Sequence, residues 1–487
     1  MKNRVKIITV LLMAALFIGL LSGCSGDSSA PAQTSGAPDI SKAVKISLDG
    51  SSATVSGGGA SADGSVVTIS AAGEYAVSGT LDDGQIIVDT GDDAMKVTLI
   101  LDNADITCLT DAAISVRKAD KLKLVLADGS VNTVTSGQEG MSPDADASGA
   151  AIYSKDDLDI EGSGTLTVNG FINNGIASKN DLKMQGGSVT VNAVNNGLRG
   201  ADSVQIEAGT IVIAAGNDGI KSATVDKAGK GFVSVSGGEV SILAAGDGID
   251  AATTLDITGG SVTAAAFGTG ETSSSKALKA ESGINISGGE LKLNSTDTAI
   301  KCAADMNISG GSIDIVSEGG KGISVEGSVN ISGGVLEINA YSDGMLAVNT
   351  FAMSGGSVNI SSGADGVQAG KNINGFPSDT GSADISGGEL LISASKRAID
   401  AKISLDITGG TVFALSGAKN PLDVKAGGQS FVSILVSGLA GDEVKFGELA
   451  SMTAKWDVTS VLFSSSELRS GTEYALVCGQ NRIEVTA

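Results

Sequence analysis

The stretch SGGSIDI, residues 309–315, joins a glycine pair that suits a tight corner to a segment in which apolar and polar residues alternate. Such alternation over four or five residues is typical of a half-buried β-strand. The pattern returns along the chain at steps of about 22 residues, which predicts a repeat protein. The other copies are QGGSVTV (185–191), EAGTIVI (207–213), SGGEVSI (236–242), TGGSVTA (258–264), SGGELKL (287–293), SGGVLEI (332–338), SGGSVNI (354–360), SGGELLI (386–392) and TGGTVFA (408–414).

Each repeat holds three short alternating segments separated by corners rich in Gly, Asn and Asp. No segment shows ten residues of helical periodicity, and the pattern of a leucine-rich repeat is absent. We therefore expect an all-β fold, a right-handed parallel β-helix with coils of about 22 residues, three strands per coil and a C-terminal β cap. Glycines are expected at corners with positive φ.

The predicted coils place equivalent residues above one another, about 4.8 Å apart. An inward apolar row and a hydrogen-bonded amide ladder, Asn285, Asn307 and Asn330, should follow. Three cysteines, Cys108, Cys302 and Cys478, are too widely spaced for a disulfide framework and are expected to be buried and free. The inward row is Ile257, Ile286, Ile308, Ile331, Met353, Ile385 and Ile407.

The N-terminus has the features of a secretory signal: Lys2, Arg4 and Lys6 precede the apolar run at 7–21. The residues LSGC at 21–24 resemble a bacterial lipobox, which implies cleavage before Cys24 and a lipid on its thiol. A transmembrane anchor is the alternative. The expected divisions are a signal peptide (1–23), a flexible tether (24–44), N-terminal coils (45–155), regular coils (156–415) and a cap (416–487).

Charge and composition limit the possible functions. With Asp+Glu 55 against Lys+Arg 32, the net charge is −23, so a phosphate backbone would be repelled and nucleic acid is not an expected partner. The chain has no histidine for acid–base work, and we expect no enzyme activity. An acidic surface of this kind suits divalent cations.

A second motif, Asn/Asp-Gly-Ile, marks one corner of each repeat, as in GNDGIKSA at 216–223. Asn and Asp are ordinary corner residues because they tolerate the left-handed region. Stacked carboxylates, however, repel one another, and solvent, a Lys or a metal ion must offset that repulsion. A calcium ion between two coils could contact both carboxylates. The candidate calcium ligands are Asn195, Asn196, Asn217, Asp218 and Asp247, the pair Asp343 and Asp365, and Asp156 and Asp157, which can also be read as a solvated acidic face.

A row of cations follows the same corner: Arg199, Lys221, Lys279 and Lys301. Three interpretations are open for Arg199 and Lys221. They can pair with Asp250 and nearby acids in a surface ladder, contact the carboxylates or hydroxyls of sugars, or supply the base of a calcium-dependent lyase. We take all four cations as candidate ligand-binding residues.

The motifs GEYAVSGTLDDGQIIVD, KVTLILDNADIT, AAIYSKDDLDIEGSGTLTVNG and the DGI…SGG units resemble a bacterial family of extracellular carbohydrate-binding lipoproteins. The resemblance covers residues 45–415. It implies a polysaccharide-lyase-like right-handed β-helix, calcium, and non-catalytic binding of cellulose or pectin, as in cellulolytic clostridia. Coils of that family often read Asp-Asp-Gly-Ile-His, and this chain has Lys, Arg or Asp in place of the His.

We therefore expect a monomeric lipoprotein, anchored through Cys24 on the extracellular face of the cell membrane, that binds polysaccharide with the help of calcium. Acidic glycan is favoured over cellulose on chemical grounds, because 3% aromatic residues offer few platforms for a flat glucan. A calcium-dependent pectate lyase and a structural adhesin without glycan affinity are the alternatives.

Overall fold

The computed structural model describes residues 40–139, 149–268, 275–371, 379–419, 424 and 428–487. Every regular element in these ranges is a strand. The chain divides into two compact units, residues 1–253 with 260–274 and residues 254–259 with 275–487. The predicted signal peptide, Cys24 and residues 24–39 of the predicted tether lie outside the described residues. Within the described ranges, no helix is long and apolar enough to cross a membrane.

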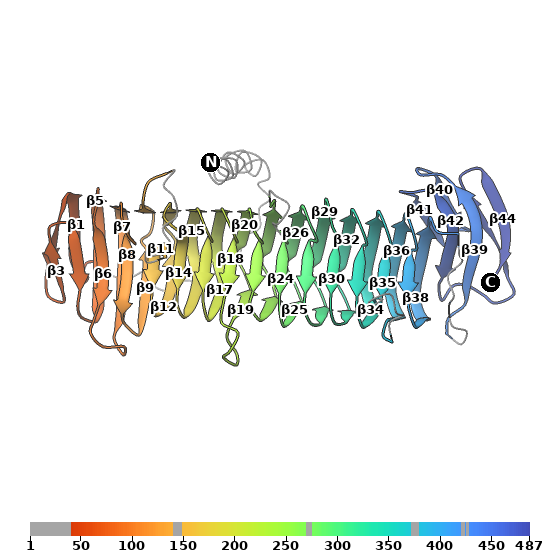
Figure 1. The fold of residues 1–487 in the computed structure, drawn as a ribbon, viewed down its shortest axis with the longest axis horizontal. Helices are drawn as coiled ribbons and strands as arrows, with labels where there is room; N and C mark the ends of the chain where they lie inside the picture. Colours follow the sequence, from red (N-terminus) through yellow and green to blue (C-terminus); the bar gives the residue numbers. More distant parts are fainter. Residues whose placement is uncertain (1–39, 140–148, 269–274, 372–378, 420–423, 425–427) are drawn as a thin grey trace. The chain divides into compact units, whose positions relative to one another are not determined.

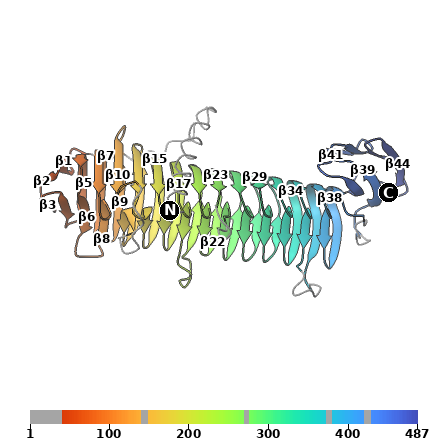
Figure 2. The same cartoon turned by 45° about the horizontal axis from the view of Figure 1, so that its top comes forward.

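In the first unit, successive repeats lie side by side and pair in parallel, as β15 and β17 show in both views (Figure 1, Figure 2). The first two segments of each repeat belong to one sheet, the wide sheet, and the third segment belongs to another, the narrow sheet. The wide sheet of this unit comprises β1 (Val44–Gly50), β2 (Ser52–Ser56), β5 (Gly73–Leu81), β7 (Lys96–Cys108), β9 (Lys121–Leu126), β10 (Val131–Ser136), β12 (Asp157–Gly162), β13 (Thr165–Gly170), β15 (Asp181–Ala193), β17 (Ser203–Ala215), β19 (Phe232–Val235), β20 (Glu239–Ala244) and β23 (Ser261–Ala266). Its narrow sheet comprises β3 (Ala60–Asp63), β4 (Val66–Ile69), β6 (Gln85–Asp89), β8 (Ile114–Lys118), β11 (Ala150–Ser154), β14 (Asn174–Ser178), β16 (Leu198–Gly200), β18 (Ile220–Ser222) and β21 (Ile249–Ala251).

The second unit repeats this division into a wide and a narrow sheet and adds a small antiparallel sheet near the C-terminus. Its wide sheet comprises β22 (Thr254–Ile257), β25 (Gly283–Ile286), β26 (Glu290–Ser295), β28 (Met306–Ile308), β29 (Ser312–Ser317), β31 (Val329–Ile331), β32 (Val335–Ala340), β34 (Thr350–Ser362), β36 (Ser382–Ala394), β38 (Ser404–Ser416), β39 (Phe431–Gly438) and β42 (Val458–Ser464). Its narrow sheet comprises β24 (Leu278–Ala280), β27 (Ile300–Cys302), β30 (Ile323–Val325), β33 (Met345–Ala347), β35 (Val367–Ala369) and β37 (Ile399–Ala401). The small sheet comprises β40 (Glu443–Phe446), β41 (Ala450–Thr453), β43 (Glu473–Cys478) and β44 (Asn481–Thr486).

The chain is all-β, as expected, but the predicted right-handed parallel β-helix with three strands per coil is wrong as stated. The first two segments of a repeat are not strands of separate sheets: β12 and β13 both pair with β15, which runs through the glycine pair as one strand of 13 residues. Antiparallel pairs also occur, β1 with β2, β3 with β4, and β38 with β42. In β15, β34, β36 and β38 the glycine pair lies inside a continuous strand, whereas in other repeats it separates two strands of the same sheet, such as β25 and β26.

The predicted inward row is confirmed. Its seven residues, from Ile257 to Ile407, are in register on neighbouring strands, and each is at most 1% exposed. The amide ladder is confirmed as well: Asn307 Nδ2 donates to Asn285 Oδ1 at 2.9 Å and Asn330 Nδ2 to Asn307 Oδ1 at 3.0 Å. The three cysteines are buried and free.

The expectation of positive φ at glycine corners is correct for one class of glycine and wrong for another. The second glycine of the pair has positive φ, for example 79° at Gly187. Gly219 of the Asp-Gly motif does not, and its requirement is steric. A Cβ there would lie 2.3 Å from Ile242 Cγ2 and 2.6 Å from the carbonyl oxygen of Gly248. This corner needs glycine because the neighbouring repeat lies too close for a side chain.

At the end of the second unit, β42 pairs antiparallel with both β38 and β39. Phe413, Phe446 and Phe463 are fully buried here, and the rings of Phe446 and Phe463 stack with centroids 4.4 Å apart. These aromatic contacts attach the C-terminal strands to the last regular repeat. The pairing with β42 covers the strand edge that β38 would otherwise leave open.

Candidate functional site

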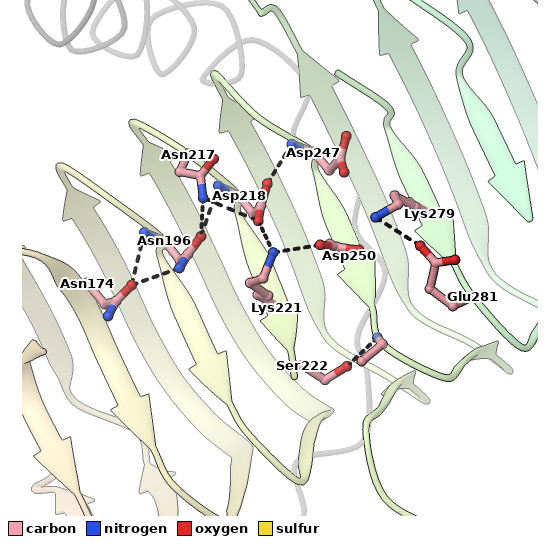
Figure 3. Close-up of polar contacts among 11 residues, drawn as sticks. Asn174, Asn196, Asn217, Asp218, Lys221, Ser222, Asp247, Asp250, Lys279 and Glu281 are labelled. Carbon is pink, nitrogen blue, oxygen red and sulfur yellow. Dashed lines mark hydrogen bonds and ion pairs between the residues drawn. The ribbon is translucent and has the colours of Figure 1, made fainter. Parts of the chain in front are cut away.

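The corner residues of the first unit form a hydrogen-bonded ladder along the edge of the narrow sheet (Figure 3). Asn174 Oδ1 accepts the backbone N–H of Asn196 at 3.1 Å, and Asn196 Oδ1 accepts that of Asp218 at 3.2 Å. Asp218 Oδ1 in turn accepts the N–H of Asp247 at 2.9 Å. Each corner oxygen thus satisfies a backbone donor of the next repeat, which explains why Asn and Asp occupy this row.

Lys221 neutralises two of the carboxylates beside this ladder. Its Nζ lies 2.6 Å from Oδ2 of Asp218, in the same repeat, and 2.6 Å from Oδ2 of Asp250, its in-register neighbour in the next repeat (Figure 3). Burial lowers the pKa of Lys221, but the hydrogen bonds and charges of the two carboxylates outweigh burial, so its pKa lies above the ordinary value. Lys221 is therefore a fixed ammonium ion at neutral pH.

The calcium ligands predicted in the first unit come together only in part. One carboxylate oxygen each of Asp218, Asp247 and Asp250 lies within 4.8 Å of the others, a spacing that a single ion could span. The ammonium group of Lys221, however, is already in contact with Asp218 and Asp250. A divalent ion about 4 Å from that ammonium would be repelled by about 8 kcal/mol at an effective dielectric of 20. These residues therefore do not fit calcium while Lys221 keeps its position.

The predicted amide ligands form hydrogen bonds with other asparagine side chains. Asn195 Nδ2 donates to Asn173 Oδ1 at 2.7 Å, and Asn217 Nδ2 donates to Asn196 Oδ1 at 3.0 Å. The amide oxygen of Asn196 thus has two donors, the Asn217 side chain and the Asp218 backbone. The amide row is a structural ladder in its own right.

The predicted pair in the second unit has the same arrangement. Asp343 Oδ1 accepts the backbone N–H of Asp365 at 3.1 Å, and Asp343 forms an ion pair with Lys321. Asp365 Oδ1 accepts the N–H of Arg397 at 3.0 Å, and its Oδ2 lies 3.6 Å from Arg397 Nη2. Both oxygens of each carboxylate face a donor of the chain, so this pair does not fit calcium either.

Asp156 and Asp157, the remaining candidates, each cap a backbone donor. Asp156 Oδ2 accepts the N–H of Ala119 at 3.1 Å and Asp157 Oδ1 that of Asp181 at 3.3 Å. Burial raises the pKa of both carboxyls. Within the described ranges, neither carboxylate belongs to a group of three acidic side chains whose oxygens lie within 4.8 Å of one another. The calcium expected from the sequence stays a prediction.

A hollow opens on the outer face of the narrow sheet of the first unit. Tyr153 on β11, Ala177 on β14 and Arg199 on β16 are in register, so the small Ala177 lies between two large side chains. The hollow has a volume of about 350 Å³. We call it the Tyr153–Arg199 groove; it is lined by Gly149, Tyr153, Asn173, Asn174, Ala177, Lys179, Asn195, Asn196 and Arg199.

The groove is polar and carries positive charge. Lys179 is exposed and Arg199 half-buried, and neither forms an ion pair with any residue in the described ranges. Burial raises the pKa of Tyr153 and the nearby charge of Arg199 opposes that rise, so the phenol stays protonated at neutral pH. The groove thus offers amides, a hydroxyl, an aromatic ring and two cations to a ligand.

The predicted cation row divides into different environments. Arg199 lines the groove, Lys221 is held in ion pairs, and Lys279 lies 3.1 Å from Glu281 (Figure 3). Lys301 is the exposed in-register neighbour of Lys279 in the second unit. Tyr153, Asn173, Ala177 and Lys179 were not among the site residues predicted from the sequence. The period of about 22 residues relates Ala177 to Arg199, whereas Tyr153 lies 24 residues before Ala177.

Comparisons with known proteins give the family. A family profile described as "Carbohydrate-binding domain-containing protein" matches residues 63–319 and 313–434, more than half of the chain. A carbohydrate-binding domain-containing protein of Acetivibrio thermocellus is 40% identical over 176 residues, 36% of this chain and 60% of that relative's length. A solved structure described as a polysaccharide lyase-like protein from C. thermocellum, gadolinium derivative, has 35% identity and a TM-score of 0.44, covering 55% of this chain and 96% of its own. The profile match confirms the carbohydrate-binding part of the expected resemblance, and the chain belongs to the family of carbohydrate-binding domain-containing proteins.

Proposed function

We propose that this protein binds polysaccharide without changing it chemically, and that the Tyr153–Arg199 groove holds acidic sugar residues of the chain. The proposal rests on the ion pairing of the cations in this row and beside it. Arg199 and Lys179 line the groove without an ion-pair partner in the described ranges, whereas Lys221, the next residue in the row after Arg199, is held by two carboxylates.

The chemistry of the groove matches a uronic acid. A guanidinium group binds a carboxylate through two parallel hydrogen bonds, and Lys179 adds a mobile ammonium at the rim. The amides of Asn173 and Asn195 can exchange hydrogen bonds with sugar hydroxyls, and the ring of Tyr153 can pack against the apolar face of a pyranose. A volume of about 350 Å³ lies at the small end of the range for ligand sites.

Binding without chemistry is favoured because the two candidate bases are unsuited to proton abstraction. Lys221 is an ammonium with a raised pKa, and the guanidinium group of Arg199 has N–H donors but no acceptor for a proton. A base must be deprotonated before it can remove a proton next to a sugar carboxylate. We therefore favour binding over the lyase alternative.

The cellular location, the lipid anchor and the identity of the glycan are part of the proposal. We place the protein on the extracellular face of the membrane, held by a lipid on Cys24, with acidic plant cell-wall glycan such as pectin as its ligand and cellulose as a weaker one. The polar groove supports the preference for acidic glycan, because its side chains suit charged and hydroxylated groups better than a flat glucan. Help from calcium stays a prediction.

A pull-down of the protein on insoluble polysaccharides tests the proposal. We expect retention on de-esterified pectin gel, weaker retention on cellulose, and elution by salt, since the contact is ionic. Each gel is used with CaCl2 and with EDTA, which separates a role of calcium in binding from direct recognition. Failure to bind any gel would favour a structural adhesin, and release of unsaturated uronides from soluble polygalacturonate would show a lyase.

A further inference from the structure

Lys221 acts as a link between two repeats. It stands on β18 in register with Asp250 on β21, and its ammonium lies 2.6 Å from both Asp250 and Asp218 (Figure 3). Asp218 is 5% and Asp250 8% exposed, so neither carboxylate is a freely solvated surface group. A cation of the chain itself thus occupies the place where two buried acids of neighbouring repeats approach each other.

The same arrangement recurs in the second unit at a different position of the repeat. Lys321 and Arg397 are themselves corner residues, and each pairs with an acid in a neighbouring repeat, Asp343 or Asp365. The guanidinium of Arg397 also lies 2.6 Å from Asp400. Three cations at different places in the chain therefore form ion pairs with corner acids.

These ion pairs differ from ordinary surface pairs because the carboxylates are fixed by the backbone. Asp218 Oδ1 accepts the N–H of Asp247, and Asp343 Oδ1 accepts that of Asp365. Each acid must face the adjacent repeat in order to satisfy that donor, so its negative charge cannot turn away into solvent. The structure requires a cation beside it.

We propose that Lys221, Lys321 and Arg397 are internal counter-ions that replace divalent metal between the repeats, so that the stack is stable without calcium. The inference is independent of the proposed glycan site, which lies around Arg199. It concerns what holds the acidic corners together in a chain of charge −23.

Thermal unfolding in excess EDTA and in excess CaCl2 tests the inference. We expect the same Tm for the wild-type protein in both. Lys221→Met should lower Tm in EDTA by about 2–4 °C, and CaCl2 should restore it, because the vacated space lies between acids that can ligate an ion. Lys45→Met, which removes an exposed lysine of the same unit, is the matched control and should leave Tm unchanged in both solutions.

A wild-type Tm that falls in EDTA and recovers in CaCl2 would overturn the inference, as would a Lys221→Met protein as stable as wild type in EDTA. If Lys221→Met does not fold, the Tm of Lys221→Arg and a calorimetric titration of calcium into the wild type and into Asp250→Asn test the inference instead. Lys221→Arg keeps the charge and should keep the wild-type Tm in EDTA. Calcium binding by the wild type that Asp250→Asn abolishes would contradict the inference; absence of that binding supports it.

Discussion

Tyr153 and Arg199 lie in one row of the narrow sheet, two repeats apart, with only the methyl group of Ala177 between them. Repeats about 4.8 Å apart separate the two backbones by about 10 Å, and Ala177 forms the floor of the groove between the two side chains. The groove therefore depends on a small residue at one position of the row as much as on the large residues beside it.

Filling this space should weaken binding without unfolding the protein. We expect Ala177→Leu to weaken binding of a galacturonate oligomer by at least about tenfold, because the new side chain occupies the hollow. Fluorescence anisotropy of a labelled oligomer measures the affinity, and circular dichroism controls for folding. Unchanged affinity in a folded variant would place the glycan elsewhere.

Arg199 should not be replaceable by lysine. Arg199→Lys keeps the charge but loses the planar pair of donors, so we expect about tenfold weaker binding of the acidic oligomer. Binding of a neutral cello-oligomer should change little. Equal losses for both ligands would show that Arg199 shapes the groove and does not recognise a carboxylate.

Gly219→Ala should destabilise the protein through steric contact alone. The added methyl would lie 2.3 Å from Ile242 Cγ2, and we expect a loss of about 1–3 kcal/mol in the free energy of unfolding. Gly58→Ala is the control, since a Cβ there meets nothing within 4 Å and φ is not positive. Denaturant unfolding compares the two variants, and a Gly219→Ala protein as stable as Gly58→Ala would contradict the close packing.

Lys121 should stabilise the first unit only as long as it is charged. Its Nζ lies 2.7 Å from Oδ2 of Asp159, which is 6% exposed and whose Oδ1 has no hydrogen-bond partner in the described ranges. Burial lowers the pKa of Lys121, but Asp159 raises it more, so the net pKa lies above the ordinary 10.5. The stabilisation is therefore complete below pH 10.5 and is lost as the pH rises through the folded-state pKa.

Lys121→Met should cost about 1–3 kcal/mol at neutral pH, because it leaves a buried carboxylate without a partner. Adding Asp159→Asn should recover part of that loss. Thermal unfolding from neutral pH to beyond pH 10.5 checks both points: the wild type should lose its advantage over Lys121→Met at the alkaline end. A constant difference across that range would mean that Lys121 acts by packing and not by charge.

The repeat and its buried row could be predicted from the sequence because period and alternation follow directly from strand geometry. Period and alternation alone were enough to predict the row from Ile257 to Ile407 and the ladder of Asn285, Asn307 and Asn330. The division of each repeat between the wide and the narrow sheet could not be predicted, because a glycine pair such as Gly186–Gly187 can end a strand or bend it. Alternation looks the same in both cases.

The candidate site was predicted only in part, because the row of Arg199 was read without the residues of earlier repeats. Tyr153 and Ala177 stand 24 residues apart in sequence but are neighbours in the sheet. Pairing of Lys221 with Asp250 was one of the interpretations open from the sequence, and the structure confirms it. The choice between a cation of the chain and a metal ion beside the stacked acids needed the structure, because the sequence does not show which side chain reaches them.

Isothermal titration of a galacturonate oligomer into the wild type and into Lys179→Ala/Arg199→Ala, with Lys45→Ala as a matched charge control, tests the central claim most directly. In each solution, EDTA or CaCl2, we expect the wild type and Lys45→Ala to bind with one affinity, and the double variant to bind at least about hundredfold more weakly. Equal affinity of the double variant and the wild type would contradict recognition of acidic sugar in the Tyr153–Arg199 groove.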